Sequence, residues 1–241
     1  MTRSIPHPTR RGAIKVGLAT CAGLALGTRT ELFAEEVARQ QELPLVMKAI
    51  PKTGEQIPVV GLGTNRYSVS DRAAIEHLCD VLKAMTDRGG SIVDTARGYG
   101  RAEEVIGECI TKNGDREKIF LVTKYSEGNG RRRGGGGGGA VDHMAQLELA
   151  FERLQTDMVD VMLVHSVSDT DNLLPMMREL KAAGRFRYVG ISISSDRDYE
   201  HTARYLRQGA LDFLQVDYSI GNRSSEVMML PLAQEHGTAV I

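Results

Sequence analysis

The fold is decided by one stretch, residues 119–165, which contains IFLVTK (119–124), VDHMAQLELAFERLQT (141–156) and MVDVMLVH (158–165). Its first and last segments are almost continuously apolar, which is typical of parallel strands that are covered on both faces. The middle segment repeats its apolar residues at the spacing of an amphipathic helix. Because parallel neighbours require a crossover, the stretch predicts a right-handed β–α–β unit.

The same alternation continues on both sides of this unit. Further strands are expected at residues 57–63, 91–96, 186–193, 212–219 and 238–241, and further helices at 70–89, 101–113, 171–184, 196–209 and 224–237. A β-hairpin with its turn at residues 53–55 is expected before them. Seven strands of this kind fit two α/β architectures, the (β/α)8 TIM-type barrel and the doubly wound open sheet.

The bulk composition excludes some classes of protein. Of 241 residues, 41% are hydrophobic, and 30 basic side chains nearly balance 31 acidic ones, which argues against a nucleic-acid-binding surface. The three cysteines, Cys21, Cys79 and Cys109, are widely spaced, so we expect neither a disulfide nor a zinc framework. Cys79 and Cys109 are interpreted as small buried residues of helices. The histidines show no metal-binding spacing, and no metal is expected.

Residues 1–36 have the order of an export leader. Arg10 and Arg11 precede a weakly apolar run, residues 16–27, which is too short to span a bilayer. The segment resembles a twin-arginine signal, although Ala13 stands where a bulky apolar residue is usual. We therefore expect residues 1–36 to be a leader that is disordered or cleaved. The protein is expected to contact the export machinery and to be periplasmic or exported, without stable insertion into the membrane. A disordered basic tail on a cytoplasmic protein is the alternative.

One segment interrupts the alternation. Residues 127–142, EGNGRRRGGGGGGAVD, contain three arginines and six consecutive glycines, which cannot form a packed core. No Gly-Lys-Ser/Thr pattern is present, so a phosphate-binding loop is not indicated. We interpret the segment as a flexible surface loop.

Polar side chains end three successive strands. Asp94 ends one strand and Tyr99 follows in the next loop, while Lys124 and His165 end the next two strands. The carboxyl ends of parallel strands share one face, where ligands bind. Each residue alone has a structural explanation, such as a turn cap, a packed ring or a solvated charge. Their succession at one face favours a reaction site.

Their chemistry favours proton donation to a carbonyl oxygen. Tyrosine has a pKa near 10 in model peptides and is a poor acid at neutral pH. A nearby Lys124 ammonium is expected to lower that pKa, and Asp94 is expected to keep the lysine charged and oriented. His165 can then donate a hydrogen bond to the substrate oxygen. No serine or cysteine lies in a nucleophile motif.

Several motifs together resemble the aldo-keto reductases. They are GLGT, DTARGYG followed by AEEVIGE, VTK, LQTDMVDVMLVH, VGIS and LQVDYS, and they run in that order through residues 49–241. The resemblance implies a (β/α)8 barrel behind an N-terminal β-hairpin, and NADP or NAD bound without a Rossmann domain. It implies a catalytic set of Asp94, Tyr99, Lys124 and His165, with Tyr99 as proton donor. The activity implied is reduction of a small aldehyde or ketone.

The resemblance also implies cofactor contacts. Ser192 and Gln215 match residues that hold the nicotinamide carboxamide, although Ile193 stands where an asparagine is usual. Gly63 and Thr64 would border the nicotinamide or the substrate, and Asp94 would also contribute to the cofactor site. The plain alternatives are that Ser192 and Gln215 satisfy backbone groups at strand ends, and that Gly63 permits a tight turn.

The last expected strand is the seventh, whereas a closed barrel needs eight. We therefore expect residues 37–241 to form a barrel domain that lacks its C-terminal end, as part of a longer product. One alternative is a degenerate barrel without redox activity, with a binding or structural role. A Rossmann-type dehydrogenase is a weaker one, because Arg66 stands where its glycine motif needs glycine. The substrate, the choice between NADPH and NADH, and the oligomeric state stay open.

Overall fold

The computed structural model describes residues 44–125, 142–167 and 169–241. Residues 45–241 form one compact unit. The expected leader and nearly all of the glycine-rich segment lie outside the described residues. Within the described part of the chain, no helix has both the length and the apolar character needed to cross a bilayer.

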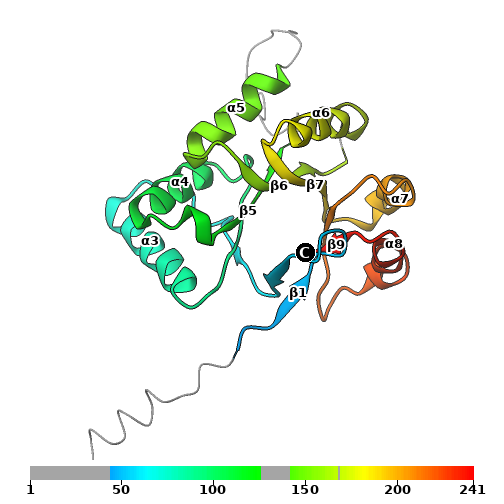
Figure 1. Cartoon of the computed structure of the whole chain (residues 1–241), viewed down its shortest axis with the longest axis horizontal. Helices are drawn as coiled ribbons and strands as arrows, with labels where there is room; N and C mark the ends of the chain where they lie inside the picture. Colours follow the sequence, from blue (N-terminus) through cyan, green and yellow to red (C-terminus); the bar gives the residue numbers. More distant parts are fainter. Residues whose placement is uncertain (1–43, 126–141, 168) are drawn as a thin grey trace, which may run out of the picture. The chain divides into compact units, whose positions relative to one another are not determined.

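The centre of the fold is a sheet of seven parallel strands that follow one another in chain order (Figure 1). A doubly wound sheet would reverse its strand order at a switch point, so the barrel-type α/β architecture is confirmed and the open-sheet alternative is wrong. The strands are β3 (Leu62–Gly63), β4 (Ile92–Asp94), β5 (Phe120–Tyr125), β6 (Val159–His165), β7 (Phe186–Ile193), β8 (Phe213–Val216) and β9 (Ala239–Val240).

The expected hairpin is present before the sheet. Strands β1 (Met47–Ala49) and β2 (Gln56–Pro58) pair antiparallel, and Gly54 adopts a positive φ of 75° in the turn. The single strand expected at residues 57–63 is instead divided between β2 and β3. The chain between them turns outward, since Val59 and Val60 are exposed.

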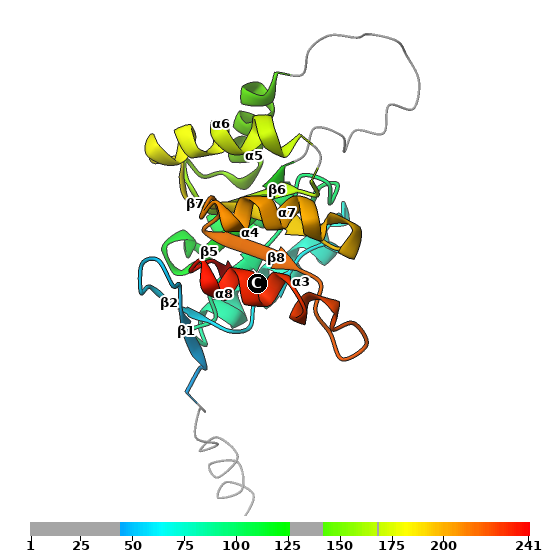
Figure 2. The same ribbon diagram turned by 90° about the vertical axis from the view of Figure 1, so that its right-hand side faces the viewer.

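Helices connect the strands and lie on the outer face of the sheet (Figures 1 and 2). The first begins at Arg72 rather than at the expected Ser70, because Asp71 is its N-cap and accepts the backbone N–H of Ala74 at 2.8 Å. The helices are α3 (Arg72–Thr86), α4 (Ala102–Asn113), α5 (His143–Leu154), α6 (Thr170–Ala182), α7 (Tyr199–Arg207) and α8 (Met229–Glu235), with 3-10 turns η1 (Arg116–Lys118), η2 (Asp196–Asp198) and η3 (Ser224–Glu226).

Alternate residues of each strand enter two separate hydrophobic clusters. On β6, Met162 and Val164 pack in the larger cluster together with helix residues, whereas Val161 and Leu163 pack in the smaller one. The smaller cluster lies on the inner face of the sheet and includes Ile50 and Ile57 from the hairpin segment. Both faces of the sheet are therefore covered, which explains why the strands are apolar throughout.

Two cysteines correct an expectation from the sequence. Cys79 of α3 and Cys109 of α4 form a disulfide, with their Cα atoms 4.7 Å apart. Both are fully buried, as expected, but the prediction that they are unbonded is wrong. The bond arises because α3 and α4 pack side by side, which brings together two residues that are 30 positions apart.

Helix α4 also approaches α5 closely. A β-carbon on Gly107 of α4 would clash with the backbone of Arg153 and Leu154 at the end of α5. Only glycine fits this contact without a backbone shift. The helices α3, α4 and α5 are thus joined successively by a covalent bond and by direct backbone packing.

Candidate active site

The candidate residues occupy the carboxyl ends of the strands, on the inner face of the sheet. Lys124 lies two positions after Val122, and His165 lies two positions after Leu163, both members of the inner cluster. Asp94, Ser192 and Gln215 follow the same alternation from Ile92, Tyr188 and Phe213. Because side chains alternate strictly along a strand, all five share the inner face.

Asp94 and Lys124 form a buried ion pair beside Tyr99. The Lys124 ammonium donates to both Asp94 oxygens, at 2.7 and 2.6 Å, and lies 3.5 Å from the Tyr99 hydroxyl. It also donates to the Thr95 carbonyl at 2.9 Å. The three ammonium protons therefore have a carboxylate, a carbonyl and a phenol as partners. The loop from Asp94 to Tyr99 is held against β5 by the Arg97 N–H, which donates to the Lys124 carbonyl at 3.2 Å.

The acidity of Tyr99 corrects a second expectation. Burial of the ring, and then the negative charge of Asp94, raise the pKa of Tyr99 above its ordinary value. Burial also lowers the pKa of Lys124, against the opposing influence of Asp94. The expected lowering of the Tyr99 pKa by Lys124 is therefore wrong for this arrangement, because burial and the paired carboxylate outweigh the lysine charge.

His165 completes the group from β6. Its ring meets the Tyr99 ring edge to face, with 6.1 Å between the ring centres. Burial, and then the positive charge of Lys124, lower the pKa of His165 below 6.5. The imidazole is thus neutral at pH 7 and can donate one N–H while accepting at its other nitrogen.

Gln215 of β8 contacts the Asp94 carboxylate, and Ser192 of β7 contacts Gln215. The Ser192 hydroxyl donates to Gln215 Oε1 at 2.7 Å, and Gln215 Nε2 donates to Asp94 Oδ1 at 3.1 Å. Strands β4 and β8 are four positions apart in the sheet, which would separate them by about 19 Å if it were flat. Their direct hydrogen bond shows that the sheet curls around this site.

Gly63 and Thr64 border the group at the end of β3. Gly63 pairs with Asp94 in the strand register, and a β-carbon on Gly63 would meet no atom within 4 Å. Thr64 is fully buried, and both its N–H and its hydroxyl donate to the Asp94 carbonyl at 3.0 Å. These contacts fix the backbone beneath the Asp94 carboxylate.

A second polar group at the same end of the strands was missed from the sequence. The Tyr125 hydroxyl lies 3.0 Å from Nδ1 of His143, whose Nε2 lies 3.6 Å from Asp169. The guanidinium of Arg97 covers the Tyr125 ring at 5.3 Å. Tyr125 follows Lys124 directly and therefore faces the helices rather than the inner face, so these residues connect the starts of α5 and α6.

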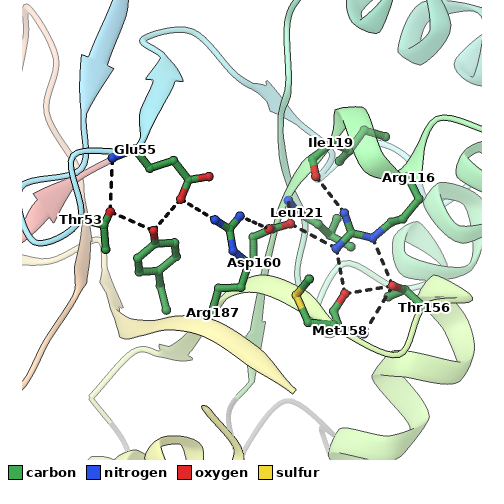
Figure 3. A network of polar contacts seen from close by, with 10 residues as sticks. Thr53, Glu55, Arg116, Ile119, Leu121, Thr156, Met158, Asp160 and Arg187 are labelled. Atoms are coloured by element: carbon green, nitrogen blue, oxygen red, sulfur yellow. Dashed lines mark hydrogen bonds and ion pairs between the residues drawn. The ribbon is translucent and has the colours of Figure 1, made fainter. Parts of the chain in front are cut away.

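The opposite end of the strands carries a larger network of charges, shown in Figure 3. Asp160, at the start of β6, accepts bonds from Arg116, Arg187 and the Leu121 N–H. Arg187 continues to Glu55 of the hairpin at 2.5 Å. This network could not be predicted from the sequence, because each charge alone resembles a solvated strand end.

A cleft of about 590 Å³ opens beside this network. Four of its charged lining residues, Glu55, Arg116, Asp160 and Arg187, are paired with one another. They therefore hold the hairpin to the sheet and stabilise the fold, and we assign the reaction site to the other end of the strands.

Comparisons with known proteins agree with this geometry. A model of the family described as "Aldo/keto reductase family" matches residues 59–241. The aldo-keto reductase YhdN of Bacillus subtilis is 29% identical over 202 residues, 78% of this chain and 58% of that protein. The NADH-specific methylglyoxal reductase of Escherichia coli is 26% identical over 218 residues, 80% of this chain and 66% of that protein.

Solved structures give the same result. An aldo/keto reductase from Klebsiella pneumoniae, crystallised with NADP and acetate, superposes with a TM-score of 0.66 at 28% identity, over 80% of this chain and 65% of that one. The chain thus spans less than two thirds of the length of each of these three proteins.

Proposed function

Because the chain belongs to the aldo/keto reductase family, we propose that it takes part in NAD(P)H-dependent reduction of a small aldehyde or ketone to an alcohol. One observation carries the proposal. The Lys124 ammonium is almost completely buried between the Asp94 carboxylate and the Tyr99 hydroxyl, at the carboxyl ends of the strands. A buried lysine held by a single carboxylate beside a phenol has no evident use in packing alone.

In this proposal Tyr99 is the proton donor. Its raised pKa keeps the phenol protonated at neutral pH, so the proton is present when the carbonyl oxygen gains negative charge. Lys124 stabilises the phenolate that remains after transfer, because its ammonium lies 3.5 Å from that oxygen. Asp94 keeps the ammonium in place, and the neutral His165 donates an N–H to the same substrate oxygen.

The residues present fit a nicotinamide cofactor, which when bound supplies the hydride. Gln215 has two N–H donors and two acceptor lone pairs, of which Asp94 and Ser192 use one each. One donor and one acceptor remain, which matches the pairing capacity of a primary carboxamide. Ile193 offers no such group. Gly63 adds no side chain at the end of β3, which leaves space beside Asp94.

The names of the relatives suggest which substrates and cofactors to test first. One of them is named a methylglyoxal reductase with NADH, and one solved structure contains NADP. We therefore propose a small reactive dicarbonyl as the first substrate and both cofactors as reductants.

The test is Tyr99→Phe, with reduction of methylglyoxal followed by loss of NADPH or NADH absorbance. We expect the rate to fall by a factor of about 10² to 10⁴, while cofactor affinity, measured by fluorescence titration, is nearly unchanged. Tyr205→Phe on α7 is the matched control, because it removes a phenol that bonds only to outer residues. A Tyr99→Phe rate close to that of the unchanged protein would show that another group is the acid.

We also propose that the protein works outside the cytoplasm. The Arg10–Arg11 pair and the apolar run after it support this, and so does the Cys79–Cys109 disulfide, because such bonds persist mainly in oxidising compartments. Replacing Arg10 and Arg11 with lysine should retain the protein inside the cell. The same distribution between cell fractions before and after the change would refute the proposal.

A further inference from the structure

Gln215 makes a contact that the proposed function does not use. Its amide nitrogen donates to Asp94 Oδ1 at 3.1 Å, and the same oxygen accepts from the Lys124 ammonium at 2.7 Å. Gln215 lies on β8 and Asp94 on β4, so this hydrogen bond crosses the inside of the curled sheet. Gln215 is half-buried and Asp94 is partly exposed, at 22% of its side chain.

The direction of this hydrogen bond is fixed by the Asp94 carboxylate. Asp94 is bonded to Lys124 as a carboxylate, which can only accept hydrogen bonds. Gln215 must therefore turn its NH2 toward Asp94, which leaves its Oε1 facing the Ser192 hydroxyl at 2.7 Å. In the opposite orientation two oxygen acceptors would face each other across 3.1 Å. Asp94 thus selects the orientation of the Gln215 amide, and the Ser192 hydroxyl supports it by donating to the remaining Oε1.

We propose that Gln215 is a positioning residue of the proton donor: its N–H fixes the Asp94 carboxylate, and Asp94 in turn holds the Lys124 ammonium beside the Tyr99 hydroxyl. The polar contacts then form one continuous series, from Ser192 through Gln215, Asp94 and Lys124 to Tyr99. This inference rests on the proposed function of Tyr99 as the acid. It adds that Gln215, which is placed to hold a cofactor carboxamide, also influences how readily Tyr99 gives up its proton.

The series predicts a measurable change at Tyr99. The charged and titratable groups that face Tyr99 are Asp94 from β4, Lys124 from β5 and His165 from β6. Gln215 withdraws part of the Asp94 negative charge by donating to it. Without this donor, Asp94 acts more strongly on the phenol and Lys124 is held less firmly, and both changes disfavour the phenolate.

The experiment is a titration of Tyr99 without cofactor. In protein labelled with ¹³C at tyrosine Cζ, the Tyr99 resonance is identified by its loss in Tyr99→Phe and is followed against pH. Gln215→Leu should raise the Tyr99 pKa by about 0.5 to 1 pH unit, and Gln215→Glu by more, because it adds a negative charge beside Asp94. Ser192→Ala removes only the donor that supports Gln215 Oε1 and should give a smaller rise.

Two further variants separate positioning from a general change in structure. Gln234→Leu on the exposed side of α8 is the matched control and should leave the Tyr99 pKa unchanged. In an Asp94→Asn background, Gln215→Leu should cause no further shift, since the charge through which it acts is gone. An unchanged Tyr99 pKa in both Gln215→Leu and Ser192→Ala would overturn the proposal, and so would a full shift in the Asp94→Asn background.

This test is distinguishable from that of the proposed function. The titration needs neither bound cofactor nor substrate, so it judges Gln215 even if carbonyl reduction is not observed. Conversely, normal reduction with an unchanged Tyr99 pKa in the Gln215 variants would leave the proposed function intact and reject only the positioning role.

Discussion

Removal of the Cys79–Cys109 disulfide should destabilise the protein strongly. The bond joins residues that are 30 positions apart in the chain. Closing a loop of this size removes about 12 cal/mol/K of conformational entropy from the unfolded chain, or about 3.6 kcal/mol at 25 °C. For a domain of about 200 residues this corresponds to a fall in Tm of about 7 to 14 °C.

The assay is thermal unfolding, followed by circular dichroism, with and without a phosphine reductant. The unchanged protein should lose the stated stability when reductant is present, because the bond is cleaved once the chain opens. The variant Cys79→Ala/Cys109→Ala is the control. It loses some packing as well, but its Tm should be the same with and without reductant.

A count of thiols checks the premise independently. In denaturant, a thiol reagent should find one reactive group, from Cys21, in the unreduced chain of three cysteines. Three reactive thiols in freshly purified protein, together with the same Tm with and without reductant, would refute the reasoning.

Two further predictions concern buried carboxylates. Asp160→Asn should lower the free energy of unfolding by about 2 to 3 kcal/mol in denaturant titration, because Arg116 and Arg187 lose their charged partner; a change below about 0.5 kcal/mol would contradict this. Burial raises the pKa of Glu103 above 4.5, so the folded state binds its proton more tightly than the unfolded state and stability falls as pH rises through that range. Glu103→Gln, which can still accept the Thr123 hydroxyl, should therefore stabilise the protein at pH 7 and by less at pH 5, whereas an advantage that grows on acidification would contradict the pKa direction.

The sequence was sufficient where a single periodicity decides the structure. The alternation of apolar strands with helices predicted seven parallel strands, and the resemblance to a family of barrels then favoured the order in which they lie. Because the carboxyl ends of parallel strands meet at one end of a sheet, the strand positions then placed Asp94, Lys124 and His165 together. These inferences need only the approximate position of each strand. The exact residue at which a strand begins or ends does not affect them.

The sequence was insufficient where two elements meet. The disulfide depends on how α3 and α4 rotate against each other, which the spacing of Cys79 and Cys109 does not reveal. The contact from Gln215 to Asp94 depends on the curl of the sheet. The pKa of Tyr99 is raised by burial of the ring and by the Asp94 charge, and the identity of the neighbouring residues alone does not reveal the direction of this shift.

The charged network around Asp160 was missed for a similar reason. A carboxylate at the start of a strand is unremarkable in a sequence. Only the position of the hairpin, with Glu55 next to Arg187, shows that these charges are paired.

The close backbone contact at Gly107 has a consequence for how the molecule opens. Helix α4 cannot separate from α5 without losing this backbone contact, and it cannot separate from α3 without breaking the disulfide. These three helices should therefore unfold and refold locally as one unit. The backbone amides of β4 and β5, the strands beneath them, should then exchange with solvent deuterium at one common opening free energy. The strands covered by α7 and α8 should open separately, at a different free energy. Local opening on the α7–α8 side would leave the Asp94–Lys124 ion pair formed but would remove the Gln215 hydrogen bond from Asp94.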